Sequence, residues 1–275
     1  MNIQTLIKIL IDSGVEENEA NCEIEMLLEH FCCLTSKDIL LGKKPTEEQL
    51  KLIEEKVNFR ASTKTPIQYI IGKAWFMGDF FKVTPDVLIP RDETELLVSK
   101  AIEIIKENSF EDVLDIGTGS GCIACTIAKN TLATVLGVDI STDALRIALD
   151  NVTSLGINNR AIFRKSDLFE SIREGEIFDL IISNPPYIPY GTSLSVEVQQ
   201  EPNLALFAHE NGLEFYRKII EKAPDYLNIG GYLMFELGIN EAEAVADMMS
   251  KDFIDIKIDK DFAGIERVIY GKLKS

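Results

Sequence analysis

A glycine-rich turn between a predicted strand and a predicted helix occupies residues 114–121, with the sequence Leu114-Asp115-Ile116-Gly117-Thr118-Gly119-Ser120-Gly121. Glycine lets the backbone turn tightly and come close to a ligand. A dinucleotide-binding fingerprint would need glycines at 117, 119 and 122, but position 122 is a cysteine. The spacing therefore favours a ligand with a nucleoside and a carboxylate but no pyrophosphate. Such a turn is a weak signal by itself, so the neighbouring segments decide its meaning.

From residue 111 onward, predicted strands alternate with predicted helices. Strands are predicted at 113–116, 135–139, 161–163, 180–183 and 231–237, and helices after Gly121 and at 142–155, 213–227 and 240–249. This alternation predicts an α/β fold, in which helices cover both faces of a mostly parallel sheet. The last two predicted strands, 254–258 and 267–270, have no helix between them and are expected to pair antiparallel.

Acidic residues end the second and third predicted strands. Asp139 lies 20 residues after Gly119, where a carboxylate can accept hydrogen bonds from both ribose hydroxyls. Asp167 could reach the amino group of an adenine, while Leu168 or Phe169 packs on the ring. Either acidic residue alone is more often a helix cap or a surface charge. Three successive strand ends with such features favour a nucleoside site.

The turn Asn184-Pro185-Pro186-Tyr187 follows the apolar strand predicted at 178–183. Neither proline can donate a backbone hydrogen bond, and Pro185 favours an extended Asn184. The result is a stiff turn with an amide, free carbonyls and an aromatic ring, at the sheet edge where open α/β sheets bind ligands. It suits a planar nitrogen, either an amide or an amino group on a base. The alternative is a turn that only ends the strand.

The first part of the chain is predicted to be a separate helical domain, at residues 1–61, because it has amphipathic periodicity and no strand signal. Thr46 and Gln49 form a capping box at the start of one helix. Residues 62–90 are predicted to be a structured connector with a β-hairpin around Gly78-Asp79, and 91–275 the α/β domain. The helical domain is either a folding or dimerisation module, or a lid or a surface that holds a macromolecular substrate.

Composition narrows the possible partners. The net charge of the 275 residues is −17, so nucleic acid is a poor candidate for the main partner. An acidic surface fits solubility or a basic protein partner. No segment reaches the roughly 18–20 apolar residues of a membrane span, and no signal-peptide pattern is present. We therefore expect a cytoplasmic protein that does not bind membranes.

The cysteines and histidines point to no redox, metal or histidine-based site. Five cysteines, an odd number, favour a reducing compartment without a disulfide framework. Cys122 and Cys125 form a CxxC within an apolar helix start, which favours small core residues, because no second ligand cluster completes a metal site. His30 and His209 are the only histidines. We expect no metal.

Six segments together resemble one family, the release factor glutamine methyltransferases, within the class I S-adenosylmethionine-dependent methyltransferases. They are Pro66–Gly72, Pro90–Glu95, residues 114–121, Asn184–Ile188, Glu201–Leu206 and Arg267–Val268. The resemblance extends over almost the whole chain and includes a helical domain before the catalytic one. One departure is Asp92, where the family usually has proline. The resemblance implies a Rossmann-like methyltransferase sheet after a small helical domain for substrate recognition.

The resemblance also implies the reaction. Family members methylate the side-chain nitrogen of the glutamine in the GGQ motif of class 1 peptide-chain release factors, a modification linked to translation termination. S-adenosyl-L-methionine would be the cofactor, and the enzyme is expected to be a monomer. The implied catalytic residues are Asn184, Pro185 and Tyr187; Pro186 completes the substrate site. The implied cofactor-binding residues are Gly117, Thr118, Gly119, Ser120, Gly121, Asp139, Asp167, Leu168 and Asn184.

Some alternatives remain open from the sequence. A methyltransferase acting on nucleic-acid amino groups would use the same Asn184 turn, although the acidic composition weighs against it. A noncatalytic binding module would keep the fold without the chemistry. Arg91 and Glu93 either order the loop over the cofactor or form a surface ion pair. Glu236, at a strand end, is a candidate support for the site.

Overall fold

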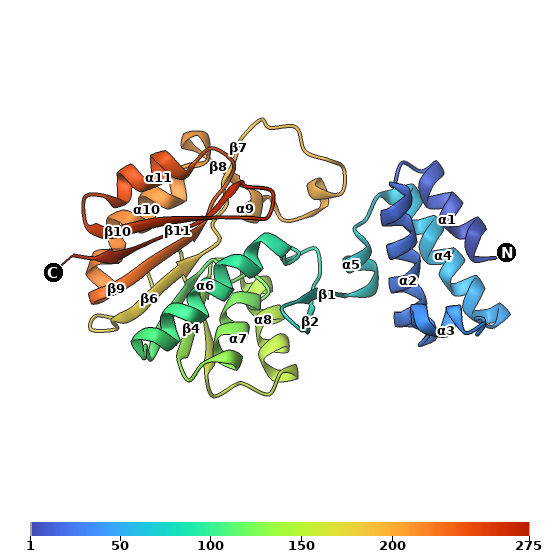
Figure 1. The fold of residues 1–275 in the computed structure, drawn as a ribbon, viewed down its shortest axis with the longest axis horizontal. Coiled ribbons are helices and arrows are strands. Elements are labelled where there is room, and N and C mark those ends of the chain that lie inside the picture. The colour runs from blue at the N-terminus through green and yellow to red at the C-terminus, as the bar shows by residue number, and fades with distance from the viewer. Residues whose placement is uncertain (1, 275) are drawn as a thin grey trace. The chain divides into compact units, whose positions relative to one another are not determined.

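The computed structural model describes residues 2–274, which form two compact units. One unit contains Met1–Lys73 together with Leu194–Gln200, and the other contains Ala74–Ser193 and Glu201–Ser275. Figure 1 shows the helices of the first unit in blue and cyan and the sheet of the second unit in green to red. No helix of the described residues is long and apolar enough to cross a membrane.

The smaller unit is a helical domain. Its helices are α1 (Ile3–Asp12), α2 (Glu17–Cys32), α3 (Ser36–Leu40), α4 (Glu47–Thr63) and α5 (Ile67–Ile71). The predicted capping box is confirmed, because Thr46 Oγ1 accepts a hydrogen bond from the Gln49 N–H and Gln49 Oε1 accepts one from the Thr46 N–H. Apolar residues spaced three or four apart on α1, α2 and α4 form one core, which includes Leu6, Leu10, Ile24, Leu27, Ile53 and Val57.

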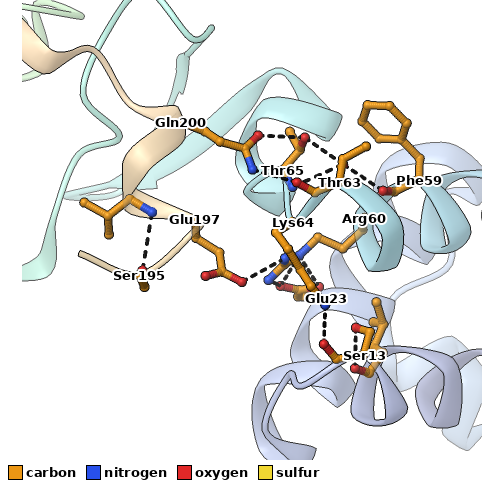
Figure 2. Close-up of polar contacts among 12 residues, drawn as sticks. Ser13, Glu23, Phe59, Arg60, Thr63, Lys64, Thr65, Ser195, Glu197 and Gln200 are labelled. Atoms are coloured by element: carbon orange, nitrogen blue, oxygen red, sulfur yellow. Dashed lines mark hydrogen bonds and ion pairs between the residues drawn. The ribbon is translucent and has the colours of Figure 1, made fainter. Parts of the chain in front are cut away.

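A buried guanidinium joins three segments of this unit. Arg60 on α4 donates to both carboxylate oxygens of Glu23 on α2, and its side chain is 2% exposed. It also donates to Glu197, at 3.2 Å, in the segment Leu194–Gln200. Gln200 donates to the Thr63 carbonyl oxygen at 2.8 Å. Figure 2 shows these contacts, which hold a segment from late in the sequence against the helices.

The larger unit is built on a seven-stranded sheet. Its strands, in spatial order, are β10 (Phe253–Lys260), β11 (Glu266–Leu273), β9 (Leu227–Glu236), β6 (Phe178–Ser183), β3 (Asp112–Ile116), β4 (Thr134–Asp139) and β5 (Ala161–Lys165). The five strands from β9 to β5 are parallel, and β11 pairs antiparallel with both β9 and β10. The predicted α/β class and the antiparallel pairing of the last two strands are confirmed.

Two apolar cores lie on opposite faces of this sheet, because successive side chains of a strand point to opposite faces. Val113 packs in the core formed with α6 (Asp92–Asn108), α7 (Cys122–Asn130) and α8 (Thr142–Ser154). The next residue, Leu114, packs in the core with α10 (Glu214–Lys222) and α11 (Ala242–Met249). In Figure 1 these two helix sets cover different faces of the sheet. Cys122 and Cys125 are buried in the first core, in agreement with the prediction.

The remaining elements are short. They are the hairpin β1 (Lys73–Phe76) and β2 (Asp79–Lys82), the parallel pair β7 (Ile188–Pro189) and β8 (Phe207–Ala208), helix α9 (Asn203–Leu206), and the 3₁₀ turns η1 (Val198–Gln200), η2 (Glu210–Gly212) and η3 (Ala223–Tyr226). The helix predicted at 213–227 is wrong at its end, because α10 stops at Lys222 and η3 contains Pro224, which cannot continue an α-helix. Strand β9 accordingly begins at Leu227, earlier than predicted.

Candidate active site

The candidate residues lie along one edge of the parallel sheet. Ile116 pairs with Ser183, and Ser183 pairs in turn with Phe235, so the carboxyl ends of β3, β6 and β9 are level. On the other side of β3, Ile116 pairs with Val138 of β4. The segments after Ile116, Val138, Ser183 and Phe235 therefore emerge side by side. This edge is where open α/β sheets bind ligands.

The glycine-rich turn presents its backbone, and its side chains point inward. Gly117, Gly119 and Gly121 have φ values of +74°, +54° and +78°, which favour glycine. A Cβ at Gly121 would lie 3.0 Å from the Phe163 ring, so the turn also packs too closely there for a larger residue. The Thr118 and Ser120 side chains are buried. Of the predicted cofactor-binding residues in this turn, these two support the loop from inside.

Asp139 connects the turn to the end of β4. Its Oδ2 accepts a hydrogen bond from the Gly119 N–H at 2.9 Å, and its Oδ1 accepts one from the Ser141 N–H at 2.8 Å. Burial raises the pKa of this carboxyl, while the backbone N–H groups act in the opposite direction by favouring the charged form. Each carboxylate oxygen can accept a further hydrogen bond, as two ribose hydroxyls would require.

Asp167 lies beside an open depression of about 440 Å³, lined by Ile140, Lys165, Ser166, Asp167, Glu170 and Ser171. Its neighbour Leu168 has a φ of +46°, which is uncommon for a residue with a side chain. From the sequence, either Leu168 or Phe169 was expected to pack on a bound base. Phe169 is buried and stacks on Tyr226 with a centroid distance of 4.8 Å, so it serves the core. Leu168, which is half-buried, remains the candidate.

Asn184 is tied to two buried side chains. Its Nδ2 donates to Thr94 Oγ1 at 3.2 Å, and Thr94 Oγ1 donates to Glu236 Oε2 at 2.6 Å. Thr94 comes from the first turn of α6, and Glu236 is the last residue of β9. Burial raises the pKa of Glu236 to about 7. The amide nitrogen of Asn184 faces Thr94, so its oxygen points elsewhere.

Tyr187 packs against a glycine, and Pro185 is buried. A Cβ at Gly238 would lie 2.9 Å from Tyr187 Cδ2, so only glycine leaves room for the ring. Burial raises the pKa of the Tyr187 hydroxyl above its usual value, which keeps it neutral. Asn184, Pro186 and Tyr187 are half-buried. The turn therefore offers an amide and an aromatic ring in a partly enclosed setting.

Arg91 and Glu93 have different partners. Arg91 pairs with the buried carboxylate of Glu201, which also accepts the Ile89 N–H at 3.2 Å. Glu93 lies 3.6 Å from Arg267. The two residues thus join α6 and the segment before it to two distant parts of the sequence. No group of three metal-ligating side chains occurs within residues 2–274.

Sequence similarity to curated relatives identifies the family of this chain. The release factor glutamine methyltransferase of Geobacter sulfurreducens is 41% identical, and the alignment covers 96% of this chain and 93% of the relative. That of Bacillus subtilis is 37% identical over 94% and 92% of the two chains. The chain belongs to the release factor glutamine methyltransferase family. A family profile described as "Methyltransferase small domain" matches residues 92–201 of this methyltransferase.

Solved structures with the same fold are more distant in sequence. A methyltransferase from Pyrococcus furiosus has a TM-score of 0.53 at 19% identity, covering 81% of this chain and 98% of its own. The 16S rRNA N2 G1207 methyltransferase of T. thermophilus has a TM-score of 0.55 at 19% identity, covering 74% and 50%. These similarities confirm the Rossmann-like methyltransferase sheet expected from the sequence.

The residues of this methyltransferase fit S-adenosylmethionine, the cofactor of its class. Asp115, which was not among the residues predicted from the sequence, is fully buried beneath the glycine-rich turn and accepts a hydrogen bond from Thr118 at 2.6 Å. Its Oδ1 has no hydrogen-bond partner among residues 2–274, and burial raises the pKa to about 7. In its ionised form this side chain would favour a cationic ligand over the turn. An acidic residue two positions before the first glycine of the turn was the signal for it.

Proposed function

We propose that this enzyme transfers the methyl group of S-adenosylmethionine to the side-chain amide nitrogen, N5, of the glutamine in the GGQ motif of class 1 release factors. The curated relatives support the release factor as the substrate. The observation that carries the chemistry is the hydrogen bond from Asn184 Nδ2 to Thr94, because it leaves the Asn184 oxygen for an incoming NH2 group.

The site must position a weak nucleophile. The lone pair of an amide nitrogen is delocalised into its carbonyl, and the sulfonium cofactor supplies a strongly activated methyl group. Asn184 Oδ1 and the Pro185 carbonyl oxygen accept the two N–H groups of the glutamine. Two acceptors would orient the nitrogen toward the methyl group that the cofactor supplies, and would stabilise the positive charge that develops on the nitrogen. Tyr187 packs against the amide plane, and Pro186 brings no competing N–H donor.

The residues at the sheet edge would hold the cofactor in this proposal. The backbone of Gly117, Gly119 and Gly121 approaches its amino acid part, and Asp139 accepts hydrogen bonds from the ribose hydroxyls. Asp167 and Leu168 would hold the adenine. Thr118 and Ser120 support the turn from inside, where both side chains are buried.

Mass spectrometry of a release factor before and after incubation with enzyme and cofactor tests this function. We expect the GGQ peptide to gain one methyl group, and adenine-containing DNA to remain unmethylated in a parallel reaction. Asn184→Ala should slow single-turnover methyl transfer on the order of 100-fold, the scale for loss of one preorganised polar contact. Cofactor affinity, measured by calorimetry, should change far less. A wild-type rate in this variant would exclude the assigned role of Asn184.

We also propose a role for each domain of the chain. The helical domain, residues 1–61, recognises the release factor; residues 62–90 connect it to the catalytic domain at 91–275. The enzyme acts as a cytoplasmic monomer without a nucleic-acid or membrane partner. The formal charge of −17 supports the absence of nucleic acid, and the five free cysteines support a reducing compartment.

A further inference from the structure

A short chain of hydrogen bonds lies behind the candidate catalytic turn. It runs from Asn184 Nδ2 to Thr94 Oγ1 over 3.2 Å and from Thr94 Oγ1 to Glu236 Oε2 over 2.6 Å. Thr94 is 2% exposed and Glu236 is 1% exposed, so bulk water does not compete for these contacts. The three residues come from α6 and from the ends of β6 and β9. None of the reacting atoms is expected to touch Thr94 or Glu236.

We propose that Thr94 and Glu236 are positioning residues that orient the Asn184 amide, so that its oxygen and not its nitrogen faces the substrate. The inference rests on the proposed function, because it assigns Asn184 Oδ1 as the acceptor for the glutamine NH2 group. Thr94 and Glu236 act only through Asn184.

The direction of the hydrogen bonds follows from the available protons. An ionised carboxylate only accepts, so the single hydroxyl proton of Thr94 goes to Glu236. Thr94 Oγ1 then has only lone pairs left for Asn184, and these bind the Asn184 NH2 group. A flipped amide would place two acceptor oxygens against each other in a buried setting, which is unfavourable. The NH2 group of Asn184 is therefore held inward, toward Thr94.

Protonation of Glu236 removes this preference for one orientation of the Asn184 amide. A neutral carboxyl can donate to Thr94, and the Thr94 proton is then free to turn toward Asn184 and stabilise the flipped amide. Burial raises the pKa of Glu236 to about 7, so this change falls near neutral pH. The ionisable groups that interact with Glu236 are Glu93, Cys122, Tyr187 and Arg267. We expect methyl transfer to become faster as pH rises through about 7.

Two substitutions of Thr94 test the arrangement in single-turnover methylation of a release factor. Thr94→Val removes the hydroxyl at similar volume and should slow transfer about 10- to 100-fold, as loss of an orienting partner does. Thr94→Ser keeps the hydroxyl and should stay close to the wild-type rate. Calorimetry should give unchanged cofactor affinity for both. A Thr94→Val rate within about twofold of wild type would overturn the inference.

The double variant separates positioning from general support. If Thr94 acts through Asn184, Thr94→Val should cause no further loss in an Asn184→Ala background. An equal loss in both backgrounds would contradict the inference. Thermal unfolding followed by circular dichroism checks that each variant folds.

Glu236→Gln supplies a second measurement. It tests whether Glu236 orients the Asn184 amide even if Thr94→Val does not fold. The wild-type pH–rate profile should rise through about 7, and Glu236→Gln should lose this step. A step that persists in Glu236→Gln would overturn the role of Glu236. Wild-type enzyme that leaves release factors unmethylated would instead overturn the proposed function itself.

Discussion

Asp139 is held in place from two sides by backbone N–H groups. Gly119 bonds to one carboxylate oxygen and Ser141 to the other, so the side chain joins the glycine-rich turn to the start of α8. A carboxylate fixed in this way needs no rearrangement to accept ribose hydroxyls, which favours tight binding. The same contacts make Asp139 part of the support of the turn.

Replacing Asp139 by alanine should therefore weaken cofactor binding. Hydrogen bonds to a charged group contribute about 1.5–3 kcal/mol each, so we expect a loss of about 10- to 100-fold in calorimetric affinity. Asp143→Ala is the matched control, because this nearby side chain is 65% exposed on α8 and should leave binding unchanged. Equal affinities for wild type and Asp139→Ala would mean that the ribose assignment is wrong.

At the scale of elements, Arg60 joins α4, α2 and the segment Leu194–Gln200. Arg60→Met would leave the Glu23 carboxylate buried without its partner, which typically costs about 3–5 kcal/mol of unfolding free energy. Urea unfolding should show this loss, and limited proteolysis should cut more rapidly within 194–200. Arg217→Met, on the exposed surface of α10, should change little. A stability equal to wild type in Arg60→Met would contradict the assigned importance of the pair.

The helical domain exposes two leucines at α3. Leu40 is 88% exposed and Leu41 is 71% exposed. If this domain recognises the release factor, replacing both by serine should raise KM for the whole protein about fivefold, the effect of losing about 1 kcal/mol of contact. The rate on a short GGQ peptide should not change. Leu132→Ser, at a 94% exposed position before β4, is the control. Unchanged kinetics with the whole release factor would exclude this surface.

At the scale of the whole molecule, three buried carboxyls link stability to pH. Burial raises the pKa of Asp115, Glu236 and Glu241 to about 7 each, well above the ordinary values of aspartate and glutamate side chains. At pH values between the ordinary pKa and the raised pKa of these groups, the folded state binds more protons than the unfolded state. The free energy of unfolding therefore falls as pH rises through this range. The low pKa of Glu176, about 2, acts in the opposite direction, and only at more acidic pH.

Urea unfolding at about pH 5 and about pH 7.5 should show this decrease, to which Glu236 contributes roughly up to 3 kcal/mol. Glu236→Gln should reduce the difference between the two conditions, because its side chain does not titrate. Stability that rises over this range in the wild-type protein would contradict the assignment.

The sequence alone determined the order of the strands along the chain and the residues that follow them. The glycine-rich turn, Asp139 and the Asn184 turn each lie next to a strand end, so local pattern was enough to place them at one sheet edge. The break after Lys222 was missed because Pro224 lies inside a helical apolar pattern.

Side chains that lie far apart in the sequence meet only because of the three-dimensional fold. Thr94 and Asn184 are 90 positions apart, and Thr94 and Glu236 are 142 apart, so their contact depends on strand register and on the packing of α6. The pairing of Arg60 with Glu197 and the burial of Phe169 against Tyr226 have the same origin. Local propensity acts between neighbours along the chain, whereas burial and hydrogen bonding select partners by their position in space.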